Sequence, residues 1–124
     1  MCSAEDNAAV DDVETPLPGS PVRGSRTGRP IMAALDLLGR RWALRILWEL
    51  RAGAVGFRAL QERCDGLSPT VLNTRLGELR AAGLVGQDEN RAHRLTPLGE
   101  DLGDALTPLR AWSVRWAEAT RGDA

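Results

Sequence analysis

The sequence predicts a mainly α-helical protein with one small β-hairpin, and three features of the chain carry this prediction. A helix over residues 69–82 has a capping signal at each end. A shorter helix precedes it across a tight turn that contains Gly66, and two strand candidates follow it around a polar turn. This order of elements is the winged helix-turn-helix fold, and we expect a C-terminal dimerisation helix after it.

The helix after Ser68 carries start and stop signals in its own sequence. Ser68 is a preferred N-cap residue, and Pro69 suits the first helical position, where a backbone N–H has no helical partner. Gly83 suits the left-handed residue that ends a helix, and Leu84 suits the apolar contact that follows it. We therefore expect both helix ends to be set by local sequence.

The chain before this helix divides into a leader and two helices. Residues 1–29 lack apolar periodicity and are rich in proline and glycine, which predicts a disordered leader. Pro30 opens a first helix that ends at Gly39, and a second helix over about residues 42–51 is apolar enough to predict burial on most sides. The first helix is expected to point these side chains inward: Ile31, Ala34, Leu35 and Leu38.

A third short helix and a hairpin complete the predicted domain. The third helix, over about residues 57–63, places Phe57 and Leu60 inward. After Gly83, residues 84–85 and 91–95 are strand candidates, and residues 88–90 between them predict a turn. This hairpin is the expected wing. It contains the chain's single histidine, which has no partner at metal-binding or catalytic spacing.

The chain ends in a long amphipathic helix that begins at the N-cap pair Thr96 and Pro97. Pro108 predicts a kink or a restart within it. An apolar stripe with two tryptophans needs a partner surface, either its own domain or, as we prefer, a second copy of the chain. The expected dimer interface consists of Leu98, Leu102, Leu106, Leu109, Trp112 and Trp116. The domains are thus a leader (1–29), a winged helix-turn-helix (30–96) and a dimerisation helix (97–120).

Composition limits the function classes. The chain has 124 residues, 43% of them apolar, and a net charge of −1, which argues against a generic polyanion binder. The charge is uneven, because residues 1–15 hold five acids and no base, whereas residues 36–80 hold eight arginines and five acids. Two cysteines without CxxC spacing and no long apolar run predict a cytoplasmic protein with no membrane contact, associated with the nucleoid when bound to DNA.

The polar face of the capped helix is the main candidate for contact with DNA. Thr70, Asn73 and Thr74 share this face, and such side chains bond or touch base edges in the major groove. Ser68 caps the helix and is also a candidate phosphate contact. An ordinary solvated helix face is the alternative.

Several arginines are further candidates. Arg41 precedes the second helix and Arg58 opens the third, and both are candidate phosphate clamps. Arg91 and Arg94 lie in the predicted wing, within reach of the minor groove or its phosphates.

Arg75 has two equal interpretations. It lies near the apolar face of the capped helix, so it either contacts DNA or forms an internal ion pair with an acid such as Glu49 or Glu78.

With these elements in place, residues 29–112 resemble the HxlR-type winged helix-turn-helix regulators of bacteria. The resemblance implies a homodimer whose recognition helices enter successive major grooves of a pseudo-palindromic DNA site, acting as a repressor or an activator. The matching runs are Pro30 to Trp42, Ile46 to Leu50, Phe57 with Leu60, Leu67 to Leu72, Arg75-Leu76, Glu78-Leu79, Gly83 to Val85, Leu95 to Gly99 and Ala111-Trp112.

The chain departs from the family pattern at several positions. Arg29 stands where such proteins usually carry a cysteine, so thiol sensing at that site is not supported. Gly56, Thr70 and Gly77 stand where the family often has a basic residue, and the wing is short. Fewer phosphate contacts lower DNA affinity. The alternative function is therefore a winged-helix dimer that acts mainly through protein contacts, or a regulator gated by an unknown small-molecule effector near its tryptophans.

An enzyme is not expected. The sequence has no metal-ligand cluster, no glycine-rich phosphate loop and no nucleophile elbow, so we expect no catalytic residues, no metal and no cofactor. Cys64 is most simply a small buried apolar residue.

Overall fold

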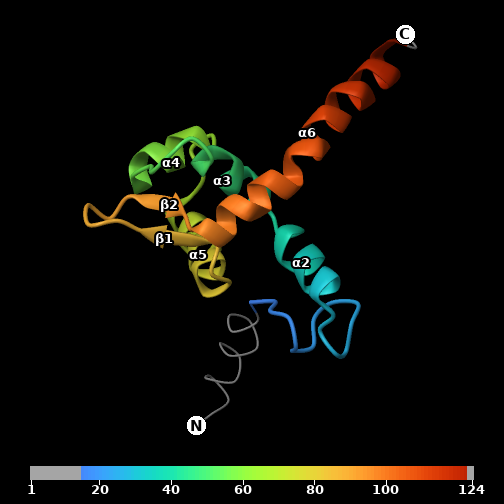
Figure 1. The fold of residues 1–124 in the computed structure, drawn as a ribbon. Helices are drawn as coiled ribbons and strands as arrows, with labels where there is room; N and C mark the ends of the chain where they lie inside the picture. The colour runs from blue at the N-terminus through green and yellow to red at the C-terminus, as the bar shows by residue number, and fades with distance from the viewer. Residues whose placement is uncertain (1–14, 123–124) are drawn as a thin grey trace.

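The computed structural model describes residues 15–122 and has the predicted winged helix-turn-helix architecture (Figure 1). The prediction for residues 1–14 lies outside the described residues. The order of elements is α2 (Pro30–Leu38), α3 (Ala43–Leu50), α4 (Phe57–Arg63), α5 (Pro69–Ala81), β1 (Val85–Gln87), β2 (His93–Leu95) and α6 (Pro97–Gly122).

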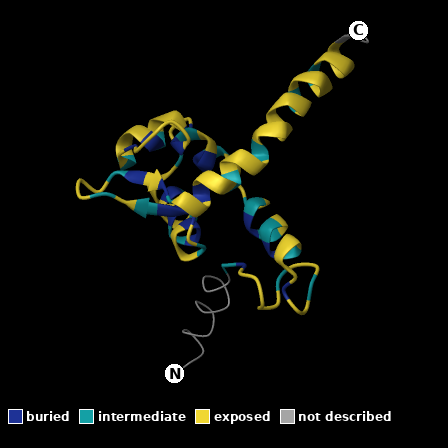
Figure 2. Ribbon diagram, in the orientation of Figure 1, coloured by how far each residue is buried: buried dark blue, intermediate teal, exposed yellow. Residues whose placement is uncertain are grey.

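The core lies between α3, α4, α5 and the base of the hairpin, which contributes Val85 and Leu95 (Figure 2). α5 contributes three leucines on one side, and α3 and α4 supply the apolar side chains that pack against them. The largest fully buried residues are Ile46, Leu50, Leu60, Leu72, Leu76, Leu79 and Cys64. Because protein interiors are closely packed, burial of these leucines fixes which side of α5 faces the core and which side faces solvent.

Both ends of α5 have the predicted caps. The Val71 N–H donates to Ser68 Oγ over 3.2 Å at the start of the helix. At its end, Gly83 has a φ of +84°, and the Leu84 N–H donates to the Leu79 carbonyl over 2.9 Å. These bonds satisfy backbone groups that the helix itself leaves unpaired, and they confirm the local capping signals.

The hairpin is present with shifted limits. β1 and β2 pair antiparallel, with Val85 opposite Leu95, and the turn extends to residue 92 because Asp88 Oδ1 accepts the N–H groups of Asn90 and Ala92. The predicted strands at 84–85 and 91–95 are therefore displaced. A third segment was missed, since Val55 exchanges two backbone hydrogen bonds of 2.8 Å with His93.

The inward face of α2 differs from the prediction. Ala33 and Leu37 are buried, whereas Ile31 is 62% and Leu35 57% exposed. The periodicity correctly marks an apolar helix, but α2 stands apart from the body and buries only one edge (Figure 1). The expectation that Ile31 and Leu35 point into this domain is therefore wrong.

Residues 15–29 are not the disordered continuation that their composition predicts. They form hydrogen-bonded turns, in which Ser25 Oγ accepts the N–H groups of Gly28 and Arg29, and the Gly19 N–H donates to the Gly28 carbonyl over 2.9 Å. Glycines at positive φ and a serine hydroxyl satisfy the backbone here without any apolar periodicity.

Two further expectations concern α3 and α6. α3 is buried on most sides, as predicted, with Leu44 39% and Trp48 40% exposed. α6 is one continuous helix that runs through Pro108, so the predicted kink or restart at this proline is wrong (Figure 1). Residue 104, whose carbonyl loses its helical partner to Pro108, is exposed, so water can satisfy that carbonyl.

The start of α6 is tied to the end of α5. Thr96 Oγ1 donates to the Gly83 carbonyl over 2.6 Å and accepts the Gly99 N–H over 3.0 Å. A Cβ at Gly99 would overlap the carbonyl of Leu84. This close approach sets the direction in which α6 leaves the domain.

We predict that Gly99→Ala lowers the free energy of unfolding by about 1–3 kcal/mol, because the added methyl group forces the helix away from Leu84. Gly103→Ala is the matched control, since a Cβ there meets nothing within 4 Å, and it should raise stability by up to about 1 kcal/mol. Urea unfolding of both variants provides the measurement. Equal effects of the two substitutions would contradict this account of the junction.

Candidate nucleic-acid interface

α5 presents a short polar face to solvent. Thr70, Asn73 and Thr74 are exposed, and the leucines on the other side of the helix are fully buried. A Cβ at Gly77, one turn further along the helix, would meet nothing within 4 Å. The face is therefore polar, open and closely approachable, as reading of base edges in a major groove requires.

Ser68 lies at the start of this face. Its hydroxyl oxygen accepts the Val71 N–H, and the residue is exposed. The hydroxyl proton is available to a phosphate oxygen, so the same side chain can cap the helix and donate to DNA.

Two arginines flank the core helices. Arg58 is the second residue of α4, and Arg41 precedes α3 at the turn where Trp42 has a φ of +75°. Both are exposed, and within residues 15–122 neither guanidinium makes a hydrogen bond or an ion pair. They are available to phosphates.

The wing contributes two more arginines. Arg94 is exposed on β2, and Arg91 is exposed in the turn with a φ of +65°. Gln87 Nε2 donates to the Arg91 carbonyl over 3.2 Å, which helps to shape the turn that presents this arginine.

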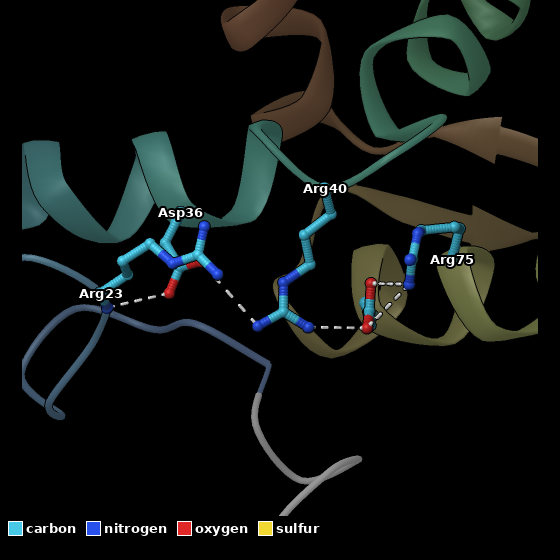
Figure 3. Close-up of polar contacts among 5 residues, drawn as sticks. Arg23, Asp36, Arg40 and Arg75 are labelled. Carbon is cyan, nitrogen blue, oxygen red and sulfur yellow. Dashed lines mark hydrogen bonds and ion pairs between the residues drawn. The ribbon is translucent and has the colours of Figure 1, made fainter.

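Arg75 forms the internal ion pair that was one of its two interpretations. Its Nη1 lies 3.1 Å and 3.2 Å from the two carboxylate oxygens of Glu78, and its Nε donates to the Arg41 carbonyl over 2.7 Å. Arg40 Nη1 donates to the same carboxylate over 2.9 Å (Figure 3). Glu78 is buried between these two guanidinium groups and joins α5 to the segment between α2 and α3.

A second polar cluster holds α3 to the end of α4. Arg45 pairs with Glu49 over 3.0 Å and with Asp65 over 3.5 Å, and it donates to the Arg63 carbonyl over 2.6 Å. The hydrogen bond to Glu49 raises the pKa of Arg45. Sequence reasoning missed this cluster, although Arg45 and Glu49 have the i, i+4 spacing that signals a helical ion pair.

The predicted dimer stripe is largely uncovered. α6 projects away from the domain (Figure 1), and Leu98 is 55%, Trp112 46% and Trp116 57% exposed. Leu109 is also exposed, whereas Leu106 is half-buried and Leu102 packs partly against the core. The rings of Trp112 and Trp116 stack, with 5.4 Å between their centroids.

More uncovered apolar surface lies outside α6, on residues that were expected to be buried. It consists of Ile31, Leu35, Leu44 and Trp48. The Arg51 guanidinium lies 3.6 Å from the centre of the Trp48 ring. Trp42 packs against the core, so the tryptophans do not form one cluster within the described chain.

Other candidate chemistry is limited. Cys64 is fully buried, as expected, and burial raises the pKa of its thiol, which disfavours the reactive thiolate. Among the described residues no group of His, Cys, Asp and Glu is arranged to hold a metal ion. None of the helices in that part of the chain is long and apolar enough to span a membrane.

Comparison with known proteins gives consistent matches. The profile of the HxlR-like helix-turn-helix family matches residues 37–121. The HTH-type transcriptional regulator YvaP of Bacillus subtilis is 30% identical over 91 residues, which cover 68% of this chain and 84% of YvaP.

Solved structures agree with this match. The quinone-bound YodB of B. subtilis is 30% identical, with a TM-score of 0.64, over 69% of this chain and 97% of YodB. A protein from Thermoplasma volcanium, described as a possible HxlR family transcriptional factor, is 26% identical, with a TM-score of 0.62, over 72% of this chain and 85% of its own.

His93 generates a pH prediction. Its ring is buried beside Phe57, and its Nδ1 has no hydrogen-bond partner among the described residues. Burial lowers the pKa of His93 below the ordinary 6.5. The positive charge of Arg80 lowers this pKa further, and the negative charge of Asp88 partly opposes the shift. The folded state therefore binds a proton at the His93 ring less tightly than the unfolded state does. Stability should be unaffected above about pH 6.5 and should fall as the pH drops from there towards the lowered pKa.

We expect this one group to cost up to about 1.4 kcal/mol between pH 7.5 and pH 5.5, because one pH unit below the unfolded pKa corresponds to 1.36 kcal/mol. Urea unfolding at the two pH values measures it. His93→Leu removes the chain's only histidine and should abolish that part of the loss. The same loss in both proteins would show that His93 is not its source.

Proposed function

This chain belongs to the HxlR-like helix-turn-helix family, whose members are transcriptional regulators and not enzymes. From that premise we propose that it is a homodimer that binds a specific pseudo-palindromic operator. The observation that carries the proposal is the exposed polar face of the doubly capped α5. Such a regulator works in the cytoplasm, on the DNA of the nucleoid.

In this proposal Thr70, Asn73 and Thr74 contact base edges, because they form the exposed face of α5. Ser68 contacts a phosphate at the helix start. Phosphate or minor-groove contacts come from exposed arginines on either side of α5, namely Arg41, Arg58, Arg91 and Arg94. Arg75 acts mainly as a positioning residue, since its guanidinium is engaged by Glu78 and by the Arg41 carbonyl.

The dimer is argued from uncovered apolar surface. Leu98, Leu109, Trp112 and Trp116 leave about half of their side chains in water on a helix that projects away from its own domain. Ile31 and Leu35 on α2 are equally uncovered. Contiguous apolar surface of this kind marks an interface, and a second copy supplies a complementary stripe by symmetry.

Symmetry then determines the form of the operator. A two-fold dimer presents two α5 helices in opposite directions, so each reads one half of an inverted repeat. Half-sites about one helical turn apart let both helices enter the major groove on one side of the duplex.

We predict that Asn73→Ala and Arg58→Ala weaken DNA binding in different ways. Loss of a base contact by Asn73 should reduce discrimination between operator and unrelated duplex about tenfold or more. Loss of a phosphate contact by Arg58 should weaken both duplexes alike and reduce the slope of log K against log salt by about 0.9. Fluorescence anisotropy titrations at several salt concentrations measure both quantities.

Arg115→Ala is the matched control for these titrations. Arg115 is an exposed arginine in the C-terminal half of α6, outside the helix-turn-helix, so its loss should change neither quantity. If Asn73→Ala and Arg58→Ala behave alike on every duplex, the roles assigned to them are wrong.

We predict that Trp116→Glu shifts the protein from dimer towards monomer. The substitution places a charge in a stripe that the dimer removes from water, twice in each symmetric pair, and should raise the dimer dissociation constant about a hundredfold or more. Sedimentation equilibrium measures this constant. Arg115→Glu places the same carboxylate at a neighbouring exposed position, and an equal shift with this control would argue against a specific interface at Trp116.

A further inference from the structure

Two adjoining hollows lie between the turns of residues 15–25 and α2. Their volumes are about 450 Å³ and 580 Å³, within the range of small-molecule sites. Both are lined by Arg23, Asp36 and Arg40, and we call the two together the leader hollow. Arg75 of α5 lines the first hollow, which brings the site to the recognition helix.

The leader hollow carries a positive charge. Three guanidinium groups line it, from Arg23, Arg40 and Arg75. The carboxylate of Asp36 also lines it, and Glu78 pairs with Arg40 and Arg75 from behind, so one positive charge is in excess. Asp36 is already engaged, since its Oδ2 accepts the Arg23 backbone N–H over 3.1 Å and its Oδ1 lies 3.9 Å from Arg40 (Figure 3). Within the described residues the Arg23 guanidinium itself makes no hydrogen bond or ion pair. An anion is the ligand that this charge favours.

Arg23 is held in place by its backbone. It lies in a turn in which Val22 and Ser25 exchange two backbone hydrogen bonds of 2.9 Å and 3.0 Å. A Cβ on Gly24 would collide with the methyl group of Met32, so the turn packs closely on α2. The guanidinium therefore extends from an ordered anchor, which reduces the entropy lost on binding.

Much of the remaining lining is apolar, with Thr15 and Ser20 as polar members in the second hollow. Met32 and Leu35 line the first hollow, and Pro16, Leu17 and Val22 line the second. A ligand with an apolar body next to its charge matches this lining. The nearby carboxylates of Asp36 and Glu78 disfavour a dianion such as phosphate and favour a single negative charge.

We propose that the leader hollow binds a small organic monocarboxylate with an apolar body, whose carboxylate contacts Arg23 and Arg40. Two sources can supply this chemistry: a free organic acid, or the chain's own residues 1–14, which contain five acids and no base. The proposal adds an effector site to the proposed function.

Arg40 connects the site to α5. The same side chain lines the leader hollow and donates over 2.9 Å to Glu78, which also holds Arg75. A carboxylate that draws Arg40 towards the hollow weakens one of the two ion pairs that position the recognition helix. We therefore expect ligand binding to change the affinity for DNA, and this step rests on the proposed function.

Benzoate is the probe, titrated into the full-length protein by calorimetry without DNA, with sodium chloride at equal ionic strength as the blank. We expect saturable binding, no binding of the neutral isostere benzamide, and a loss of affinity of about tenfold or more in Arg23→Gln. Arg26→Gln is the matched control, because Arg26 is exposed directly after this turn and does not line the leader hollow. Equal binding of benzoate and benzamide, or an unchanged affinity in Arg23→Gln, would overturn the proposal.

A second full-length variant distinguishes the two sources. It carries Glu5→Gln, Asp6→Asn, Asp11→Asn, Asp12→Asn and Glu14→Gln. Equal benzoate affinity in the wild type and this variant assigns the site to a free acid, and binding about tenfold tighter in the variant assigns it to the chain's own carboxylates. Absence of binding in both proteins overturns the proposal.

The link to α5 is read separately, as the effect of benzoate on operator affinity. We expect at least about a threefold change in the wild type and none in Arg23→Gln. Benzoate binding without that change overturns the link and leaves the carboxylate site standing. Benzoate binding by a protein that binds no operator contradicts the proposed function and not the site.

Discussion

The arrangement of the helices in this protein depends on the ion pairs that the carboxylate of Glu78 forms. This carboxylate is buried on α5 between the guanidinium groups of Arg40 and Arg75, and Arg75 continues to the carbonyl of Arg41. One acid thus joins the recognition helix to the segment that connects α2 with α3. A buried carboxylate is tolerated only with such partners, so the cluster favours the placement of these elements in which Glu78 keeps both arginines. The leucines of α5 supply the apolar stabilisation, and the ion pairs specify its orientation against α2.

The rest of the molecule leaves much apolar surface in water. α6 departs from the domain in a direction set by Thr96 and by the close packing of Gly99 on Leu84, and most of its length remains exposed (Figure 2). α2 exposes Ile31 and Leu35 in the same way. A chain of 124 residues gains little from a long exposed helix unless that surface is covered by a partner. The dimer proposed above would cover this surface.

Much of the fold was predictable because its signals are local. The caps of α5 at Ser68 and Gly83 and the N-cap of α6 at Thr96 depend on a few adjacent residues, and all three have the expected hydrogen bonds. The buried face of α2 was not predictable, because the sequence marks an apolar helix without saying whether its own domain or a partner covers it. The pairing of Val55 with His93 joins segments far apart in the chain, and the turns around Ser25 have no periodicity to detect. Of the candidate site, the exposed face of α5 followed from helical spacing, whereas the choice of Glu78 over Glu49 as the partner of Arg75 needed the three-dimensional arrangement.

The most direct test of the central claim is selection of bound duplexes from a randomised DNA pool by the purified full-length protein at moderate salt. The account predicts enrichment of an inverted repeat whose half-sites lie about one helical turn apart, because two α5 helices related by a two-fold axis read the two halves. A folded dimer that enriches no sequence would contradict the account and favour a winged-helix protein that acts through protein contacts.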